Sequence, residues 1–257
     1  MQNKIIFEQP LNERMRNLLR LEHLFDLIAF RSKETISKWD YRNILESLLE
    51  INDLLSRSDF KTELIKELER HSAMLTSLEN NPAVDQTRLK KINSDICELS
   101  VMLKSKAYQP GNALKEDELV TSFKQRNSIP GGACNFDLPR LHYWLNQATT
   151  IQQQDFDNWS KDIAPIKKST YLAMDMIRNS SNPTKEKAES GFYQQPIESN
   201  LPCQLIRVVL PSASRYYPEI SGGKHRFTIR FMEEITTTNR PAQTSNDVEF
   251  ELHCCIL

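Results

Sequence analysis

Residues 216–231 read YYPEISGGKHRFTIRF, and the second half of this stretch alternates apolar and cationic side chains with a period of two. Successive residues of a strand point to opposite faces, so one set is expected to enter a core. The expected core set is Phe227, Ile229 and Phe231. The set expected on the outer face is Arg226, Thr228 and Arg230. The stretch therefore predicts a strand with a rigid row of cationic groups on its outer side.

Strand spacing extends to both sides of this stretch. The expected strands span 203–210, 215–220, 225–233 and 247–255, and Gly222-Gly223 is typical of a hairpin turn between the middle two. The segment KIIFE at 4–8 is also strand-like and cannot bury itself among helices. We therefore expect it to join the C-terminal sheet.

Between about residues 12 and 179 the apolar side chains recur at helical spacing. Two heptad-spaced stripes, at 64–78 and 89–103, flank Asn80-Asn81-Pro82 and predict a long antiparallel helical hairpin. Asn12 is a candidate cap for the first helix, and Pro165 is expected to kink or split the last one. The other expected helices span 12–30, 40–56, 114–126, 138–149 and 154–179.

The change of period predicts an α+β fold. A helical domain is expected at 11–180 and a mainly C-terminal antiparallel β domain at 191–257, which the strand within 1–10 joins. Residues 181–190, rich in polar side chains, are expected to form a linker.

Composition restricts the function. The 257 residues hold 33 basic and 34 acidic side chains, which excludes a globally cationic nucleic-acid binder, so any basic site must be local. No apolar run approaches the roughly 20 residues needed to span a bilayer. We therefore expect no membrane partner, and we expect the protein to be located in the cytoplasm.

Catalytic motifs are missing from the sequence. The six glycines form neither a dinucleotide fingerprint nor a phosphate-binding loop, and the five cysteines and five histidines have no metal-ligand spacing. Cys134, after a glycine-rich approach, stays open as a nucleophile, because its partners would be distant in the chain. The expectation is a protein that is not an enzyme, with no cofactor, metal or catalytic residue.

Cationic side chains on ordered elements are the remaining candidates for a site. Guanidinium groups fixed on a strand suit carboxylates or phosphates. Arg16 and Arg20, one helical turn apart, repel each other unless something compensates, and Glu13 is one such compensating group. For the strand arginines the competing interpretation is neutralisation by Glu249 and Glu251, which share one face of the last strand.

Three blocks together resemble the ZapD family of bacterial cell division factors, which associate with FtsZ. The blocks read FEQPLNERMR at 7–16 with LRLE at 19–22, RNSIPGGACNFDLP at 126–139 with LHYWL at 141–145, and YPEISG at 217–222 followed by Lys224, Arg226-Phe227 and IRFM at 229–232. The match covers essentially the whole chain in order and spacing.

The resemblance implies a homodimer that binds the C-terminal tail of FtsZ, bundles its filaments and promotes assembly of the division ring at mid-cell. Glu118 departs from the family pattern, since relatives can carry an arginine there. A histidine beside Tyr143 and Trp144 on a helix is more often packed or structural, and only the resemblance favours a binding role for His142. The tail-binding residues that the resemblance implies are Arg16, Arg20, Arg126, His142, Lys224, Arg226 and Arg230. The alternative is a module for nucleic acid or another anionic partner, against which the near-neutral net charge and the lack of an aromatic stacking row argue.

Overall fold

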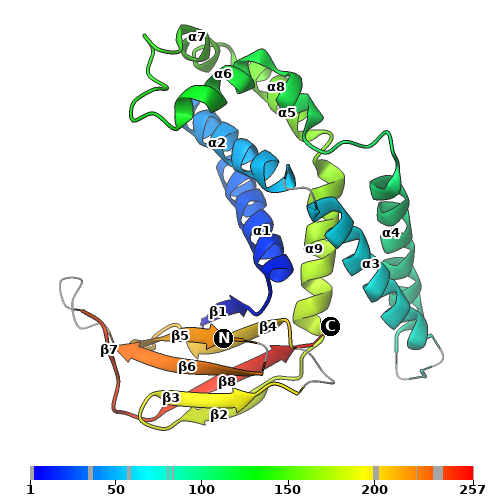
Figure 1. Ribbon diagram of the computed structural model, residues 1–257, viewed down its shortest axis with the longest axis vertical. Helices are drawn as coiled ribbons and strands as arrows, with labels where there is room; N and C mark the ends of the chain where they lie inside the picture. The colour runs from blue at the N-terminus through cyan, green and yellow to red at the C-terminus, as the bar shows by residue number, and fades with distance from the viewer. Residues whose placement is uncertain are drawn as a thin grey trace. The chain divides into compact units, whose positions relative to one another are not determined.

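The structure is a computed structural model that describes residues 3–33, 37–56, 59–79, 81–82, 84–198, 203–223, 225–233 and 240–256. It is α+β, as expected, with helices from α1 to α9 and antiparallel sheets built mainly from the C-terminal part (Figure 1). The chain divides into two compact units, one comprising 1–16 and 174–257 and the other 17–173. The division falls inside α1 (Glu13–Arg31) and inside α9 (Ala164–Asn179).

The first unit, here called the sheet unit, contains two antiparallel sheets. One has the order β1-β4-β8-β2, and the other has the order β3-β6-β5 with β7 also paired to β6. The strands are β1 (Lys4–Pro10), β2 (Thr184–Ala188), β3 (Phe192–Pro196), β4 (Leu205–Pro211), β5 (Tyr216–Gly222), β6 (Arg226–Glu233), β7 (Ala242–Gln243) and β8 (Val248–Cys255).

The core of the sheet unit combines inward-facing side chains of both sheets. Phe227, Ile229 and Phe231 of β6 are fully buried, and Phe231 lies 5.0 Å from Phe250 of β8 between ring centroids. Arg226, just before Phe227, and Arg230, between Ile229 and Phe231, are exposed. The period-two pattern of the sequence is thus confirmed, because each apolar residue enters the core and each arginine leaves it.

Strand β1 joins the C-terminal strands, as predicted. Its seven residues pair antiparallel with β4 from Lys4↔Pro211 to Pro10↔Leu205. Asn12 then caps α1, since its Oδ1 accepts a hydrogen bond of 2.8 Å from the backbone N–H of Met15. The sheet is therefore built from both ends of the chain.

The expectation of a linker at 181–190 was wrong. Residues 184–188 form β2, which pairs with β8 from Thr184↔Leu252 to Ala188↔Val248. Lys185 and Lys187 are exposed, while Ala188 on the opposite face enters the core. A short strand with one solvated face and one small buried residue has a polar composition like that of a linker, which explains the error.

The second unit, here called the helical unit, holds residues 17–173. Its helices, besides parts of α1 and α9, are α2 (Lys38–Leu55), α3 (Phe60–Ser77), α4 (Gln86–Lys104), α5 (Asn112–Glu116), α6 (Glu118–Asn127), α7 (Pro139–Leu145) and α8 (Thr149–Ser160). Helices α3 and α4 lie side by side as the predicted hairpin (Figure 1). Ser72 Oγ of α3 lies 2.7 Å from Asn93 Oδ1 of α4.

The last predicted helix is divided in two. Helix α8 ends at Ser160 and α9 begins at Ala164, so that Pro165 occupies the first turn of α9. Proline is tolerated there because the first backbone N–H groups of a helix have no intrahelical acceptor. Pro165 therefore splits the segment instead of kinking a continuous helix.

Candidate functional site

The arginines of β6 stand on a central strand. β6 lies between β3 and β5, so its outward side chains have neighbours on both sides. Arg230 is opposite Glu219 of β5 and Phe192 of β3, and Arg226 is opposite Pro196 of β3. No ion pair joins Arg226 or Arg230 to another described residue. We call the outward pair of guanidinium groups, Arg226 and Arg230, the strand comb.

The competing interpretation, in which Glu249 and Glu251 neutralise the strand arginines, does not hold. Both acids lie on β8, in the other sheet. Glu251 bonds to Lys4 Nζ at 3.0 Å and to His253 Nε2 at 3.0 Å, and Glu249 is opposite Lys187 of β2. The acidic residue opposite Arg230 on the neighbouring strand β5 is Glu219. An exposed cross-strand pair of opposite charges contributes about 0.2–1 kcal/mol to stability.

Arg16 also belongs to the sheet unit. Its Nε lies 3.3 Å from Glu13 Oε2, and both side chains are about half exposed or more, 45% and 65%. The compensating interaction with Glu13 is therefore present. An exposed pair of this kind contributes about 0–1 kcal/mol, so it leaves the guanidinium accessible to a stronger anion.

Three predicted residues belong to the helical unit. Arg20 lines a shallow pocket of about 430 Å³ together with the acids Glu50 and Asp53 of α2. Arg126, in the last turn of α6, has its Nη1 3.9 Å from Asp137 Oδ1. His142 of α7 is exposed, so it does not occupy the packed position that was its alternative interpretation. Lys224 lies outside the described residues.

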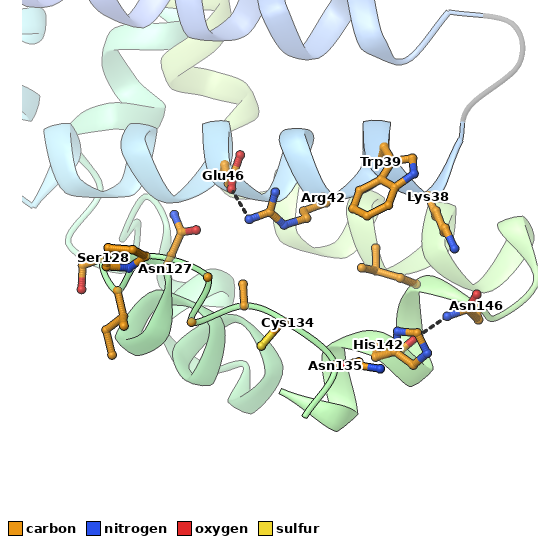
Figure 2. Close-up of a pocket in the computed structure, with 16 residues that line it drawn as sticks. Lys38, Trp39, Arg42, Glu46, Asn127, Ser128, Cys134, Asn135, His142 and Asn146 are labelled. Atoms are coloured by element: carbon orange, nitrogen blue, oxygen red, sulfur yellow. Dashed lines mark hydrogen bonds and ion pairs between the residues drawn. The ribbon is translucent and has the colours of Figure 1, made fainter. Parts of the chain in front are cut away.

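His142 lines a pocket of about 820 Å³ in the helical unit. One wall is the start of α2, and the other is the loop between α6 and α7 (Figure 2). We call it the α2–loop pocket. Figure 2 shows Lys38, Trp39 and Arg42 projecting from α2 toward the loop, with His142 and Asn146 at one end. Its lining residues on the loop side run from Asn127 to Asn135.

The loop wall is held by its own backbone. Gly132 donates to the carbonyl of Ile129 at 2.8 Å, and Cys134 donates to that of Gly131 at 3.0 Å. A Cβ on Gly132 would lie 2.5 Å from the carbonyl oxygen of Arg126, so only glycine fits this turn. The glycine-rich segment therefore serves to fold the loop tightly against the end of α6.

Cys134 lines the same pocket, but the contacts do not favour a nucleophile. Its Sγ lies 3.5 Å from Asp137 Oδ2, and within the described ranges no histidine or lysine hydrogen-bonds to the sulfur. The residues that the structure describes contain no group of three His, Cys, Asp or Glu side chains that could hold a metal ion. None of the described helices is long and apolar enough to cross a membrane.

Lys38, Trp39, Arg42 and Ile129 were missed by the sequence reasoning. A signal existed for Trp39, because it falls outside the apolar stripe of α2, whose buried members include Tyr41, Ile44 and Leu48. A large apolar side chain beside, and not within, a helical stripe is a candidate for a surface contact. No comparable signal marked Ile129, whose position depends on the fold of the loop.

The sequence profile of ZapD, described as a cell division protein, matches residues 19–230. Three full-length relatives, each named cell division protein ZapD, come from Methylococcus capsulatus, Azoarcus sp. and Nitrosomonas europaea. The first is 38% identical over 257 residues and covers 100% of both chains. The second is 37% identical over 254 residues, 98% of this chain and 100% of the relative. The third is 39% identical over 253 residues, 98% of this chain and 95% of the relative. Through this match over most of its length, the chain belongs to the ZapD family of cell division proteins.

Proposed function

We propose that this protein binds the C-terminal tail of FtsZ and, as a homodimer, crosslinks and bundles FtsZ filaments, thereby promoting assembly of the division ring. Its site of action would be the cytoplasm at mid-cell. The proposal assigns no catalytic step and no cofactor to the chain. It combines membership of a cell division family with a set of cationic side chains that could hold an acidic peptide.

The strand comb is the observation that carries the proposal. Arg226 and Arg230 are exposed, and neither forms an ion pair with a described residue. The buried side chains between and beside them, Phe227, Ile229 and Phe231, fix the strand, so the backbone positions of the two arginines are set before a ligand arrives. Preorganisation lowers the entropy lost on binding, and a guanidinium can grip a carboxylate through two hydrogen bonds.

The other residues that the resemblance implies are proposed as further contacts for acidic groups of the FtsZ tail. Arg16, Arg20, Arg126 and His142 are all exposed. Two weak tail contacts on one dimer would then gain about 10²- to 10⁴-fold in avidity on a partner that is itself a polymer.

The test is co-sedimentation with FtsZ filaments, using intact FtsZ and FtsZ that lacks its tail. Wild type is expected to pellet with intact FtsZ only, and Arg226→Glu/Arg230→Glu is expected to pellet with neither. Arg226→Gln/Arg230→Gln removes the charge without placing a new acid opposite Glu219, so it separates loss of attraction from new repulsion. Equal pelleting in every combination would reject the site.

A matched control is available on the helical hairpin. Lys90→Glu/Lys91→Glu changes the formal charge by the same amount at two exposed positions of α4. This variant should leave co-sedimentation unchanged if binding depends on where the cationic side chains lie and not on the net charge of the protein. Retention of labelled duplex or single-stranded DNA by the wild type, and its loss in the strand variant, would instead favour the nucleic-acid alternative.

A further inference from the structure

The α2–loop pocket leaves large apolar side chains in contact with water. Of the three tryptophans of the chain, Trp144 and Trp159 are buried, whereas Trp39 is 62% exposed at the pocket. Ile129, on the opposite wall, is 47% exposed. Burying such side chains on binding is favourable in proportion to the apolar area removed from water. The pocket therefore offers apolar binding energy that the folded chain does not use.

The turn of helix that carries Trp39 is fixed before any ligand arrives. Trp39 lies in the first turn of α2, which a capping box fixes: Asp40 N–H donates to Ser37 Oγ at 3.3 Å, and Ser37 N–H donates to Asp40 Oδ2 at 3.0 Å. The ammonium group of Lys38 lies 5.6 Å from the centroid of the indole ring. The opposite wall is equally fixed by the backbone hydrogen bonds of the loop.

The charged groups at the pocket are mainly cationic. Lys38 and Arg42 line it, and the acid among the lining residues, Glu46, bonds to Arg42 at 3.0 Å. Lys38 has no carboxylate partner among the described residues. A ligand that fits this arrangement carries an apolar side chain between the two walls and carboxylates beside it.

We propose that the α2–loop pocket is an anchor site for an acidic peptide, which inserts one bulky apolar side chain into the pocket against Trp39 while neighbouring carboxylates meet Lys38 and Arg42. The assignment rests on the proposed function for its biological partner, an acidic tail, and adds an apolar contact to the charge recognition described above. Charge alone selects acidic segments in general, whereas an apolar anchor selects those with a large side chain at one position.

The test uses two synthetic labelled peptides and the full-length chain. In one peptide a leucine is flanked by aspartates on both sides, and in the other a serine replaces the leucine. Fluorescence anisotropy is expected to show that the leucine peptide binds about tenfold or more tightly. Binding should also shift the tryptophan emission to shorter wavelength, because Trp39 is the exposed tryptophan. Equal binding of the two peptides, or no binding of the leucine peptide, would overturn the proposal.

Single substitutions test whether the preference for the leucine peptide depends on Trp39. Trp39→Ala should abolish the preference for leucine, and Trp39→Phe should retain most of it. Phe30→Ala is the matched control, because Phe30 is 71% exposed, also lies under a lysine ammonium, with Lys33 Nζ 5.9 Å from its ring centroid, and does not line the pocket. A preference for leucine that survives in Trp39→Ala would refute the anchor.

A peptide with the sequence of the FtsZ tail distinguishes this inference from the proposed function. If it binds Trp39→Ala as well as wild type but fails to bind Arg226→Glu/Arg230→Glu, the anchor is wrong and the proposed function stands. If it binds none of these proteins while the leucine peptide binds wild type, the pocket stands and the partner is wrong.

Discussion

Glu8 of β1 accepts two hydrogen bonds from the guanidinium group of Arg178 in α9, from Nε to Oε1 at 2.8 Å and from Nη2 to Oε2 at 2.7 Å. Arg207 of β4 donates to the same Oε1 at 2.8 Å. All three side chains are at most one quarter exposed, and all belong to the sheet unit. One carboxylate thus joins the N-terminal strand, its neighbouring strand and the last turns of α9.

Replacing this carboxylate should destabilise the sheet unit. Glu8→Gln leaves two partly buried guanidinium groups without their counter-charge, and we expect a loss of about 3 kcal/mol in the free energy of unfolding. Lys104→Gln is the control, because its bridge to Glu69 is half exposed, 52% and 51%, and its loss should cost about 0–1 kcal/mol. Thermal unfolding followed by circular dichroism measures both, and equal effects would contradict the assignment.

The same cluster predicts a pH dependence. Burial by itself raises the pKa of Glu8, but the hydrogen bonds and charges of Arg178 and Arg207 outweigh it and hold the pKa below its ordinary value. A carboxyl with a lowered pKa in the folded state contributes stability above its unfolded pKa of about 4.3, and this contribution is lost as the pH falls through the folded pKa. The difference in melting temperature between wild type and Glu8→Gln should therefore shrink below about pH 4.3. A difference in melting temperature that stays constant down to strongly acidic pH would contradict a lowered pKa of Glu8.

Two neighbouring glycines of the loop wall should respond differently to alanine. Gly132→Ala forces a contact with the carbonyl oxygen of Arg126 and should cost about 1–3 kcal/mol. Gly131 has a φ of +71° and open space around it, so Gly131→Ala should cost about 1 kcal/mol through the backbone alone. Gly132→Ala should also weaken binding of the leucine peptide, since it displaces Ile129. Urea unfolding and peptide anisotropy check both effects, and a larger loss in Gly131→Ala would be the contrary result.

A buried polar pair lies within the apolar stripe of the helical hairpin. Glu67 and His71 are 0% exposed, Glu67 Oε1 lies 3.2 Å from His71 Nε2, and Arg70 bonds to the same oxygen. Glu67→Leu and His71→Leu should each be destabilising, while the double variant should be less destabilised than their sum by about 0.5–3 kcal/mol. Additive effects in this double-mutant cycle would show that the two side chains are not energetically coupled.

Bundling should weaken with salt. The strand comb is exposed, and the screening length falls from about 10 Å at 0.1 M salt to about 3 Å at 1 M. Light scattering of FtsZ filaments mixed with wild type should decline as potassium chloride is raised, and the decline should be shallower for Arg226→Gln/Arg230→Gln. An identical salt dependence of the two proteins would exclude these arginines from the contact.

The strands and helices were predictable where apolar side chains repeat with one clear period. β6 and the α3–α4 hairpin are such cases, because each exposes one face and buries the other. β2 was not predictable, because its central side chains are charged and its pairing with β8 supplies the order that its own composition does not. A segment of that composition is a strand only when a neighbour offers a free edge.

The sequence by itself determined the alternation that buries Phe227 and exposes Arg226 and Arg230, because side-chain direction along a strand follows from local geometry. It also determined the family, through blocks spread over the whole chain. Only the tertiary structure decided which acids lie near those arginines and that Trp39 and Ile129 line one pocket. Such neighbours come from segments far apart in the chain, and their meeting depends on sheet order and loop packing, which no local pattern encodes.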